Sequence, residues 1–406
     1  MKRFLIIALL LMLSSASFAV GYRFDERGPR AALTNPAFLG LQTRHDFAIE
    51  IPGADAIVSN NSFSVRFWNE HIAGDEYWDG EDVQTILARI PETGLRMSAA
   101  ATAPMIGFRY RNVAINAELI GIGRAAVPKD VAEMVLVGTK LNEAYSLGML
   151  AGESVAVSDY SLAFGWKLSQ DRHGSITMGA AVHYYQGLVM TQVDEFSGDL
   201  LVTENSITGE GMFRYATGTY GNGFGADVGL MAQVSEKWQF GFAAKQIGAR
   251  LVWEKTDITE EYFETDVEGI YIDSLEEEGY SERILASESH TYEGGVTTTT
   301  LPRVLQATAV YSASAHWCFA GFVGTYGGSE LVEESKEMGL DIMYVPARWT
   351  FLRGGASTGG LHRTMFSFGT GLRFGNYELD ISVASTGGLF KSAQGAGLEI
   401  SQRLFF

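Results

Sequence analysis

The stretch FSFGTGLRFGNYELDISV, residues 366–383, decides the fold class, because it has the pattern of two strands joined by a two-residue turn. Large apolar side chains alternate with small, polar or charged ones on both sides of Gly375-Asn376, which is the period of a β-strand. A two-residue turn there places Arg373 opposite Glu378 on the neighbouring strand. The hairpin therefore has one apolar, aromatic face and one face of small or charged side chains.

The same alternation recurs along the chain, so the hairpin is one unit of a larger sheet. From residue 158 onward, short turns alternate with long connections, and Trp166, Trp238, Trp317 and Trp349 lie beside the short turns. The long connections fall at about 187–222, 249–301, 327–337, 356–364 and 385–393. Transmembrane barrels have short turns at one end, longer loops at the other and aromatic belts at the membrane boundaries. The sequence therefore predicts an all-β fold, a closed antiparallel transmembrane β-barrel.

Parity sets the expected number of strands, because membrane barrels usually have an even number. About eleven strands fit between Tyr160 and Phe406, so an odd number must precede them. Candidates for these lie at 45–51, 57–67 and 106–122. In the third candidate the apolar phase changes at Arg111-Asn112. A bulge there keeps one strand and gives about fourteen in all, whereas a hairpin would make two strands. Parity favours the bulge, with sixteen strands as the alternative.

Residues 1–19 have the three parts of a secretory signal peptide. Lys2 and Arg3 form the positive region, residues 4–13 are apolar, and a stretch of small residues ends at Ala19. The apolar region is too short to cross a bilayer as a helix, which disfavours the alternative of a membrane anchor. We therefore expect export to the outer membrane, with cleavage after Ala19.

Composition excludes several other classes of protein. The net charge of −18 falls to −20 when Lys2 and Arg3 are removed with the signal peptide, and so acidic a chain is unsuited to binding nucleic acid. The single Cys318 allows no intrachain disulfide and no multi-cysteine metal site. The last strand is amphipathic and ends in Phe406. This ending resembles the signal that the outer-membrane barrel-assembly machinery recognises, so we expect that machinery and outer-membrane lipid as partners.

The stretch ALTNPAFLG, residues 32–40, follows the expected cleavage site. Here the chain resembles the FadL/PorV-like superfamily of outer-membrane barrels, whose members carry an Asn-Pro-Ala element near the mature N-terminus. Three further stretches, 223–248, 301–303 and 369–380, look like a middle hairpin, a strand start and a late hairpin of that superfamily. More narrowly, IPETG at 90–94 and VPKDV at 127–131 are similar to an uncharacterised bacterial family within it.

The resemblance implies a division of the mature chain. In fatty-acid-transporting members of the superfamily, the N-terminal segment plugs the lumen and hydrophobic ligands pass through a gap in the wall. Residues 20–44 are then a plug-like segment and residues 45–406 the barrel. Asn35, Pro36 and Ala37 are the candidates for a plug or gate, and a simple turn at Asn35-Pro36 is the alternative.

Three segments are expected off the barrel wall. Apolar residues recur at helical spacing in 83–90 and 131–135, which predicts two short helices packed against a barrel mouth or a lumen plug. Residues 254–301 hold fourteen acidic residues against Lys255 and Arg283, which predicts an acidic extracellular loop. A solvated loop is one interpretation, and a divalent-cation site or contact with a basic partner is the other. The spacing of the acids matches no EF-hand.

Charged residues on the expected strands share the face opposite the apolar one. By phase these lumen-facing charges are Asp227, Lys245, Arg373, Glu378, Asp380, Glu399 and Arg403. A charge facing lipid at the bilayer midplane would cost roughly 2–4 kcal/mol, so their one-sidedness supports the orientation. They either set selectivity and hold a plug, or pair with one another and fill the barrel interior.

Motifs for catalysis or cofactor binding do not stand out. The seven histidines show no HExxH pattern, and no GxSxG elbow, P-loop or Rossmann fingerprint is present. His183 and His316 fall on inward-facing positions and are expected to line the lumen. We therefore predict no enzyme, no cofactor and no metal, with an outer-membrane hydrolase as the remote alternative.

Two functions remain open from the sequence. The first is a FadL-like barrel that binds or passes hydrophobic small molecules. The second is a non-transporting barrel that anchors or assists a surface or secretion complex, which the PorV side of the resemblance implies. A continuous apolar cavity would favour the first, and a lumen filled by paired charges and residues 69–105 would favour the second.

Overall fold

The structure is a computed structural model. The residues that it describes are 27–41, 43–73, 78, 80–137, 142–148, 150–172, 174–204, 206–268, 286–329, 331–360 and 363–406. The signal peptide predicted at 1–19 lies outside them.

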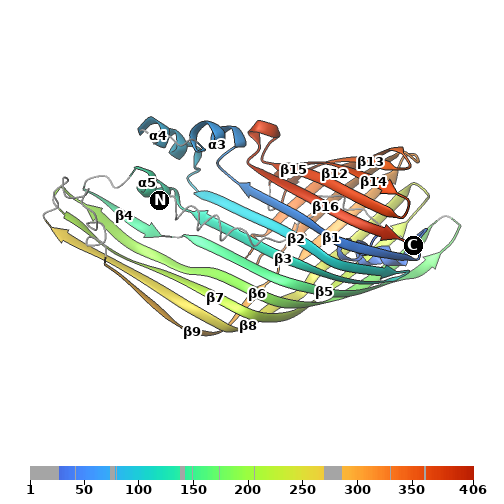
Figure 1. The fold of residues 1–406 in the computed structure, drawn as a ribbon, viewed down its shortest axis with the longest axis horizontal. Coiled ribbons are helices and arrows are strands. Elements are labelled where there is room, and N and C mark those ends of the chain that lie inside the picture. The colour runs from blue at the N-terminus through green and yellow to red at the C-terminus, as the bar shows by residue number, and fades with distance from the viewer. Residues whose placement is uncertain are drawn as a thin grey trace.

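Fourteen strands form a closed antiparallel barrel (Figure 1), as the alternation predicts. They are β1 (Phe47–Asn60), β2 (Leu95–Tyr110), β3 (Val113–Val127), β5 (Ala151–Gln170), β6 (Ser175–Val202), β7 (Ser206–Gln233), β8 (Trp238–Glu268), β10 (Val304–Ser312), β11 (Trp317–Tyr326), β12 (Ser335–Ala347), β13 (Thr350–Gly359), β14 (Thr364–Phe374), β15 (Tyr377–Thr386) and β16 (Gly395–Phe405). Each pairs with the next along the barrel, β10 pairs with β8, and β16 pairs with β1 to close the wall.

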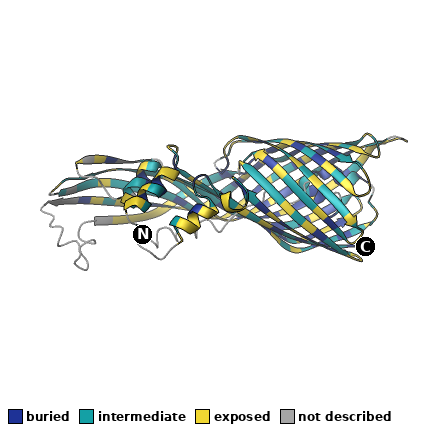
Figure 2. Cartoon of the chain, turned by 90° about the horizontal axis from the view of Figure 1, so that it is seen from above, coloured by how far each residue is buried: buried dark blue, intermediate teal, exposed yellow. Residues whose placement is uncertain are grey.

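Three barrel strands continue far beyond the wall. β6 and β7 have 28 residues each and β8 has 31, whereas about 9–11 residues suffice to cross a membrane. Their distal parts pair with the two extra strands, β4 (Glu143–Gly148) and β9 (Ala286–Thr300). We call β4, β9 and residues 193–202, 206–219 and 254–268 the extension sheet. Figure 2 shows it projecting from one end of the barrel.

The extension sheet corrects two expectations. The ranges 187–222 and 249–301 are largely strand, where long loops and an acidic loop at 254–301 were expected. Side-chain hydrogen bonds within and between strands explain why acidic residues are tolerated in a sheet here. The Glu260 carboxylate accepts hydrogen bonds from Tyr292 (2.7 Å), Tyr262 (2.8 Å) and Arg214 (2.9 Å), and these bonds lower its pKa. Residues 269–285 of the predicted loop lie outside the described residues.

Two predictions about the N-terminal strands were wrong, but together they left the predicted number of strands unchanged. One strand, β1, replaces the two expected at 45–51 and 57–67, because Pro52-Gly53 makes a bulge in a continuous strand and residues 65–71 are helical. The expected single strand at 106–122 belongs to a hairpin of β2 and β3. Arg111 takes a left-handed conformation, φ 54°, at its two-residue turn, so the phase change marks a turn and not a bulge.

The helices are short. They are α2 (Ala31–Thr34), η1 (Pro36–Gly40), α3 (Val65–His71), α4 (Gly80–Arg89), α5 (Lys129–Val137) and η3 (Phe390–Ser392). α4 and α5 confirm the helices expected from apolar spacing, and they pack together through Val83, Leu87 and Ala132 at the ends of β2 and β3. In the described part of the chain, no helix is long and apolar enough to cross a membrane.

The outer face of every barrel strand exposes large apolar side chains. Examples are Phe108, Leu162, Phe242, Phe319, Leu340 and Phe368. Trp238, Trp317 and Trp349 are 40–58% exposed beside the short turns. Phe406 is exposed at the same end, and its backbone pairs with Phe47. Inner positions of the same strands carry the charged and small residues, so the two faces of the wall are chemically opposite.

Candidate functional site in the barrel lumen

The N-terminal segment lies inside the lumen and spans it. We call residues 27–41 the plug segment; it contains α2 and η1. At one side Arg27 forms an ion pair with Glu378 on β15, 2.9 Å apart, and at the other Asn35 contacts the backbone of β7 and β8. Ala37 and Phe38 are at most 2% exposed. The plug segment is therefore held by opposite walls of the barrel.

The Asn-Pro-Ala element makes the closest contacts of the plug segment with the wall. Asn35 Oδ1 accepts a hydrogen bond from the Ala37 N–H (2.9 Å) and so caps η1, whose first residue is Pro36. Asn35 Nδ2 donates to the carbonyl oxygens of Leu230 (3.4 Å) and Phe242 (3.2 Å). The side chain therefore joins the turn to two strands, which is more than the simple-turn alternative requires.

Two wall glycines make this docking possible. A Cβ on Gly179 would lie 2.2 Å from the Pro36 carbonyl carbon, and a Cβ on Gly229 would lie 1.9 Å from Asn35 Oδ1. Both distances are far shorter than any van der Waals contact. The plug segment thus rests directly on the backbone of β6 and β7, and only glycine fits beneath it.

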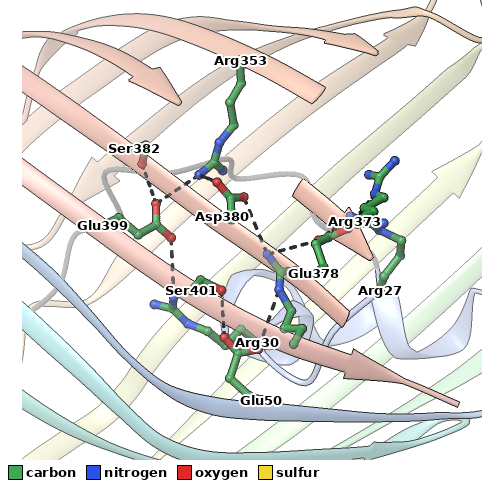
Figure 3. Close-up of polar contacts among 11 residues, drawn as sticks. Arg27, Arg30, Glu50, Arg353, Arg373, Glu378, Asp380, Ser382, Glu399 and Ser401 are labelled. Atoms are coloured by element: carbon green, nitrogen blue, oxygen red, sulfur yellow. Dashed lines mark hydrogen bonds and ion pairs between the residues drawn. The ribbon is translucent and has the colours of Figure 1, made fainter. Parts of the chain in front are cut away.

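An ionic network joins the plug segment to β1, β13, β14, β15 and β16 (Figure 3). Arg30 lies 3.6 Å from Glu399, and Arg353 pairs with both Asp380 and Glu399. Arg403 lies 3.8–3.9 Å from Glu378, Asp380 and Glu50. The network's carboxylates also accept hydrogen bonds from Ser382 and Ser401, both at 3.0 Å. Pairing and hydrogen bonding offset part of the free-energy cost of burying these charges.

The seven charges chosen from the sequence fall into two places. Arg373, Glu378, Asp380, Glu399 and Arg403 belong to the ionic network. Lys245 donates instead to the Leu33 carbonyl oxygen of the plug segment (3.2 Å), and Asp227 accepts from the Gln246 backbone N–H (2.7 Å).

The partners of these charges were not predicted from the sequence. Arg27, Arg30, Glu50 and Arg353 were not singled out, although Glu50 is a charged residue between two isoleucines of an alternating strand. Arg109 was missed as well, and its guanidinium donates to the carbonyl oxygens of Arg27 and Phe38, both at 3.3 Å. The phase of β1 and β2 could have found Glu50 and Arg109, whereas nothing local to the plug segment indicates its partners.

The two histidines expected in the lumen lie in different places. His183 is 4% exposed, with Nδ1 3.0 Å from Asp159 and Nε2 3.3 Å from Asp227. His316 is exposed in a short turn, with Nδ1 2.7 Å from the Val345 carbonyl oxygen, so its predicted lumen position is wrong. Its phase was counted through the turn before β11, which begins one residue later. Among the described residues, no group of three or more His, Cys, Asp or Glu side chains is arranged to hold a metal ion.

Beyond His183, toward the extension sheet, the inner face becomes apolar. We call this group the Trp253 cluster: Ile122, Val155, Val157, Tyr185, Met190, Ala216, Ala249, Leu251, Trp253, Leu301, Val304, Tyr326, Leu331 and Val332. Trp253, Leu251 and Tyr185 are all 0% exposed. The indole N–H of Trp253 donates to Thr299 Oγ1 (3.0 Å), so the polar edge of this ring is satisfied.

Two members of the Trp253 cluster come from the connection between β11 and β12. Leu331 and Val332 are 2% and 0% exposed, although the residues around them are polar. Ser329 Oγ accepts from both of their backbone N–H groups (3.2 Å each), and Glu333 pairs with Arg96 at the surface, 3.2 Å away. A surface turn therefore inserts two apolar side chains into the cluster.

The comparisons with known proteins agree with this architecture. The family model described as F plasmid transfer operon, TraF, protein matches residues 73–297, more than half of the chain. The chain belongs to this family. The search of the curated proteins found no match.

The TraF-family chain is also similar to solved barrels. Its match to the Ralstonia pickettii toluene transporter TbuX covers 93% of this chain and 94% of TbuX, with 14% sequence identity and a TM-score of 0.52. The match to the P. putida toluene transporter TodX covers 97% of this chain and 96% of TodX, with 9% sequence identity and a TM-score of 0.52. At such identities the likeness shows the fold alone, and it confirms the FadL-like architecture predicted from the sequence.

Proposed function

We propose that this chain is an integral outer-membrane β-barrel that binds hydrophobic small molecules and passes them through its lumen. The apolar outer face, the exposed tryptophans beside the short turns and the FadL-like fold support the membrane location. In this orientation the short turns and Phe406 lie on the periplasmic side, and the extension sheet lies outside the cell. Fractionation and a heat-modifiability gel test the location, and recovery as a soluble periplasmic monomer would contradict it.

The observation that carries the proposed function is the Trp253 cluster. A water-filled barrel has a polar interior, yet here a fully buried Trp253 and its neighbours line the lumen at one end. Leu331 and Val332 occupy the cluster from a surface connection and not from the wall. An apolar molecule makes the same non-directional contacts, and burying a side chain of this size is worth roughly 1.5–3 kcal/mol. Such a molecule can therefore replace them.

The plug segment limits the route of a ligand. It spans the lumen between β15 and β7. A molecule in the Trp253 cluster therefore has the plug segment on its periplasmic side, together with the polar layer formed by His183, Asp159 and Asp227. Passage then requires either movement of the plug segment or an exit between strands. TbuX and TodX are described as toluene transporters, so toluene is the first molecule with which to test passage.

Binding and passage are tested separately. With the barrel in lipid nanodiscs, 1-bromodecane should quench tryptophan fluorescence with a saturable component. The Trp253→Phe variant should lose that component, and Trp349→Phe, at an exposed tryptophan, should keep it. Cells that carry the barrel should also take up radiolabelled toluene faster than cells with an empty vector. Non-saturable quenching alike in all three proteins would refute binding, and equal uptake would refute passage.

A second candidate function is a surface platform for a secretion or conjugation complex. The extension sheet favours it, because a channel needs no strands of 28–31 residues. Residues 193–219, 254–268 and 286–300 hold 14 acidic residues and 2 Lys or Arg residues. The family description names a plasmid transfer operon, so mating frequency is the first readout. Shortening the β8–β9 hairpin should abolish transfer and spare toluene uptake if the platform function holds.

A further inference from the structure

The hydroxyl of Tyr185 stands out within the Trp253 cluster. The residue is 0% exposed, and its Oη has no hydrogen-bond partner among the residues that the structure describes. An unpaired buried hydroxyl costs free energy that a phenylalanine would avoid. The other polar aromatic groups of the cluster are satisfied, since Trp253 donates to Thr299 and Tyr326 donates to Glu337 (2.7 Å). Within the Trp253 cluster, the hydroxyl of Tyr185 thus differs from the polar groups of Trp253 and Tyr326, which both have hydrogen-bond partners.

Tyr185 lies at the boundary between the apolar and polar layers of the lumen. Its ring stacks on His183, with centroids 5.7 Å apart and planes 10° apart, while it belongs to the same cluster as Trp253 and Leu251. Behind the ring, a Cβ on Gly225 would lie 2.9 Å from Tyr185 Cε2, so the ring rests on the backbone of β7. A ligand with its apolar body among the cluster side chains would meet this hydroxyl as its first polar contact.

The charges of the adjoining layer restrict what that contact can be. His183 lies between the carboxylates of Asp159 and Asp227, at 3.0 and 3.3 Å, and all three side chains are about 4% exposed. An added carboxylate would be repelled by two buried acids. A cationic group would have to displace His183, which already holds the place between them. An uncharged hydrogen-bonding group meets neither obstacle.

We propose that the Trp253 cluster is a ligand site whose single polar contact is the Tyr185 hydroxyl, and that its ligand is an apolar molecule with one uncharged hydrogen-bonding group, such as a primary alcohol. This inference rests on the proposed function and narrows its substrate class. The ligand takes the place of Leu331 and Val332, and its hydroxyl completes the hydrogen bonding of Tyr185.

Three probes of equal chain length test the inference: decane, 1-decanol and decanoate. Dissociation constants are measured with the barrel in lipid nanodiscs and corrected for partition into protein-free nanodiscs. We expect 1-decanol to bind about tenfold more tightly than decane, the value of one neutral hydrogen bond, and decanoate to bind more weakly than 1-decanol. Tyr185→Phe should bind the alcohol and the alkane equally, with the alkane affinity unchanged.

Tyr377→Phe is the matched control, because it lies on β15 outside the Trp253 cluster and removes a hydroxyl that already donates to Gln402 (2.7 Å). It should keep the alcohol preference. Without ligand, Tyr185→Phe should unfold at the same or higher urea concentration than the parent, and Tyr377→Phe at a lower one. A preference for 1-decanol that survives in Tyr185→Phe, or tightest binding of decanoate, would overturn the inference and leave the proposed function standing. Binding of none of the probes would overturn both.

Discussion

The lumen of this barrel is filled in two different ways along one continuous wall. On the side of the short turns, the plug segment is held by ion pairs, hydrogen bonds and direct contact with glycine backbone. On the side of the extension sheet, the filling is apolar, and part of it comes from a surface connection. Along β6, the inward-facing residues pass from the plug segment to the Trp253 cluster within a few positions: Gly179 lies under the plug segment, and Tyr185 belongs to the cluster.

The two halves differ in whether the groups that fill the lumen can be replaced by another molecule. Every buried charge in the plug half needs a specific partner at a specific place, so the contents of that half are fixed. Apolar contacts are non-directional, so in our proposal the side chains of the surface connection are the replaceable part of the Trp253 cluster. We therefore expect substitutions in the plug half to damage folding, and substitutions in the apolar half to be compensated by a ligand.

The largest effect is expected at Arg403, which is 7% exposed and contacts three carboxylates. Arg403→Met leaves those acids without this cation and should lower the free energy of unfolding by about 3–5 kcal/mol. Urea unfolding in lipid vesicles measures it. Arg66→Met removes the exposed pair with Glu70 and should cost at most about 1 kcal/mol. Similar losses in both variants would show that the network does not hold the plug half.

A smaller effect is expected at Leu331 in the apolar half. Leu331→Ala should cost about 2–3 kcal/mol, toward the lower end for a buried leucine because a surface connection can relax. Saturating 1-decanol should restore most of this loss in the variant. No recovery with the alcohol would mean that the Trp253 cluster is an ordinary core and not an exchangeable filling.

Asn35 should rank third. Asn35→Ala removes the cap of η1 and two hydrogen bonds to the wall, and we expect a loss of about 1–2 kcal/mol. Hydrogen exchange should rise at the amides of residues 31–40. Thr34→Ala is the control, because its hydroxyl makes a long contact, 3.5 Å, with the Arg30 carbonyl oxygen. Equal exchange in both variants would argue against a special role of Asn35.

The smallest effect is expected at the surface pair of Arg96 and Glu333. Glu333→Gln should cost between about 0.2 and 1 kcal/mol at low salt, and the difference should vanish at high salt, because exposed pairs are screened. Unfolding midpoints at two salt concentrations measure it. A loss that persists at high salt would mean that the pair does more than tether the connection next to Leu331.

The barrel wall was predictable wherever its outer face is apolar. The opening hairpin has the expected register, with Arg373 opposite Glu378. The extension sheet was not predictable, because a strand outside a membrane needs no apolar face, and its acids resemble those of a loop. The strand count was right, although β1 was counted as two strands and a bulge was favoured over the hairpin turn at Arg111-Asn112.

The candidate site was predictable only on the wall. Strand phase placed Arg403 and Glu378 on one face, but Arg27 and Glu378 are 351 positions apart, and no local pattern pairs them. The Asn35-Pro36-Ala37 element came from a resemblance, and its role as a gate stays a prediction. The Trp253 cluster was hidden because many of its members lie in the ranges 249–301 and 327–337, which were expected to be loops.

A crystal structure of the purified barrel with 1-decanol tests the central contrast most directly. We predict that the alcohol lies among the side chains of the Trp253 cluster, with its oxygen within hydrogen-bond distance of Tyr185 Oη. Leu331 and Val332 should be withdrawn, and the plug segment should keep its contacts through Asn35 and Arg27. Alcohol bound only on the outer face, or a displaced plug segment beside an unchanged Trp253 cluster, would contradict it.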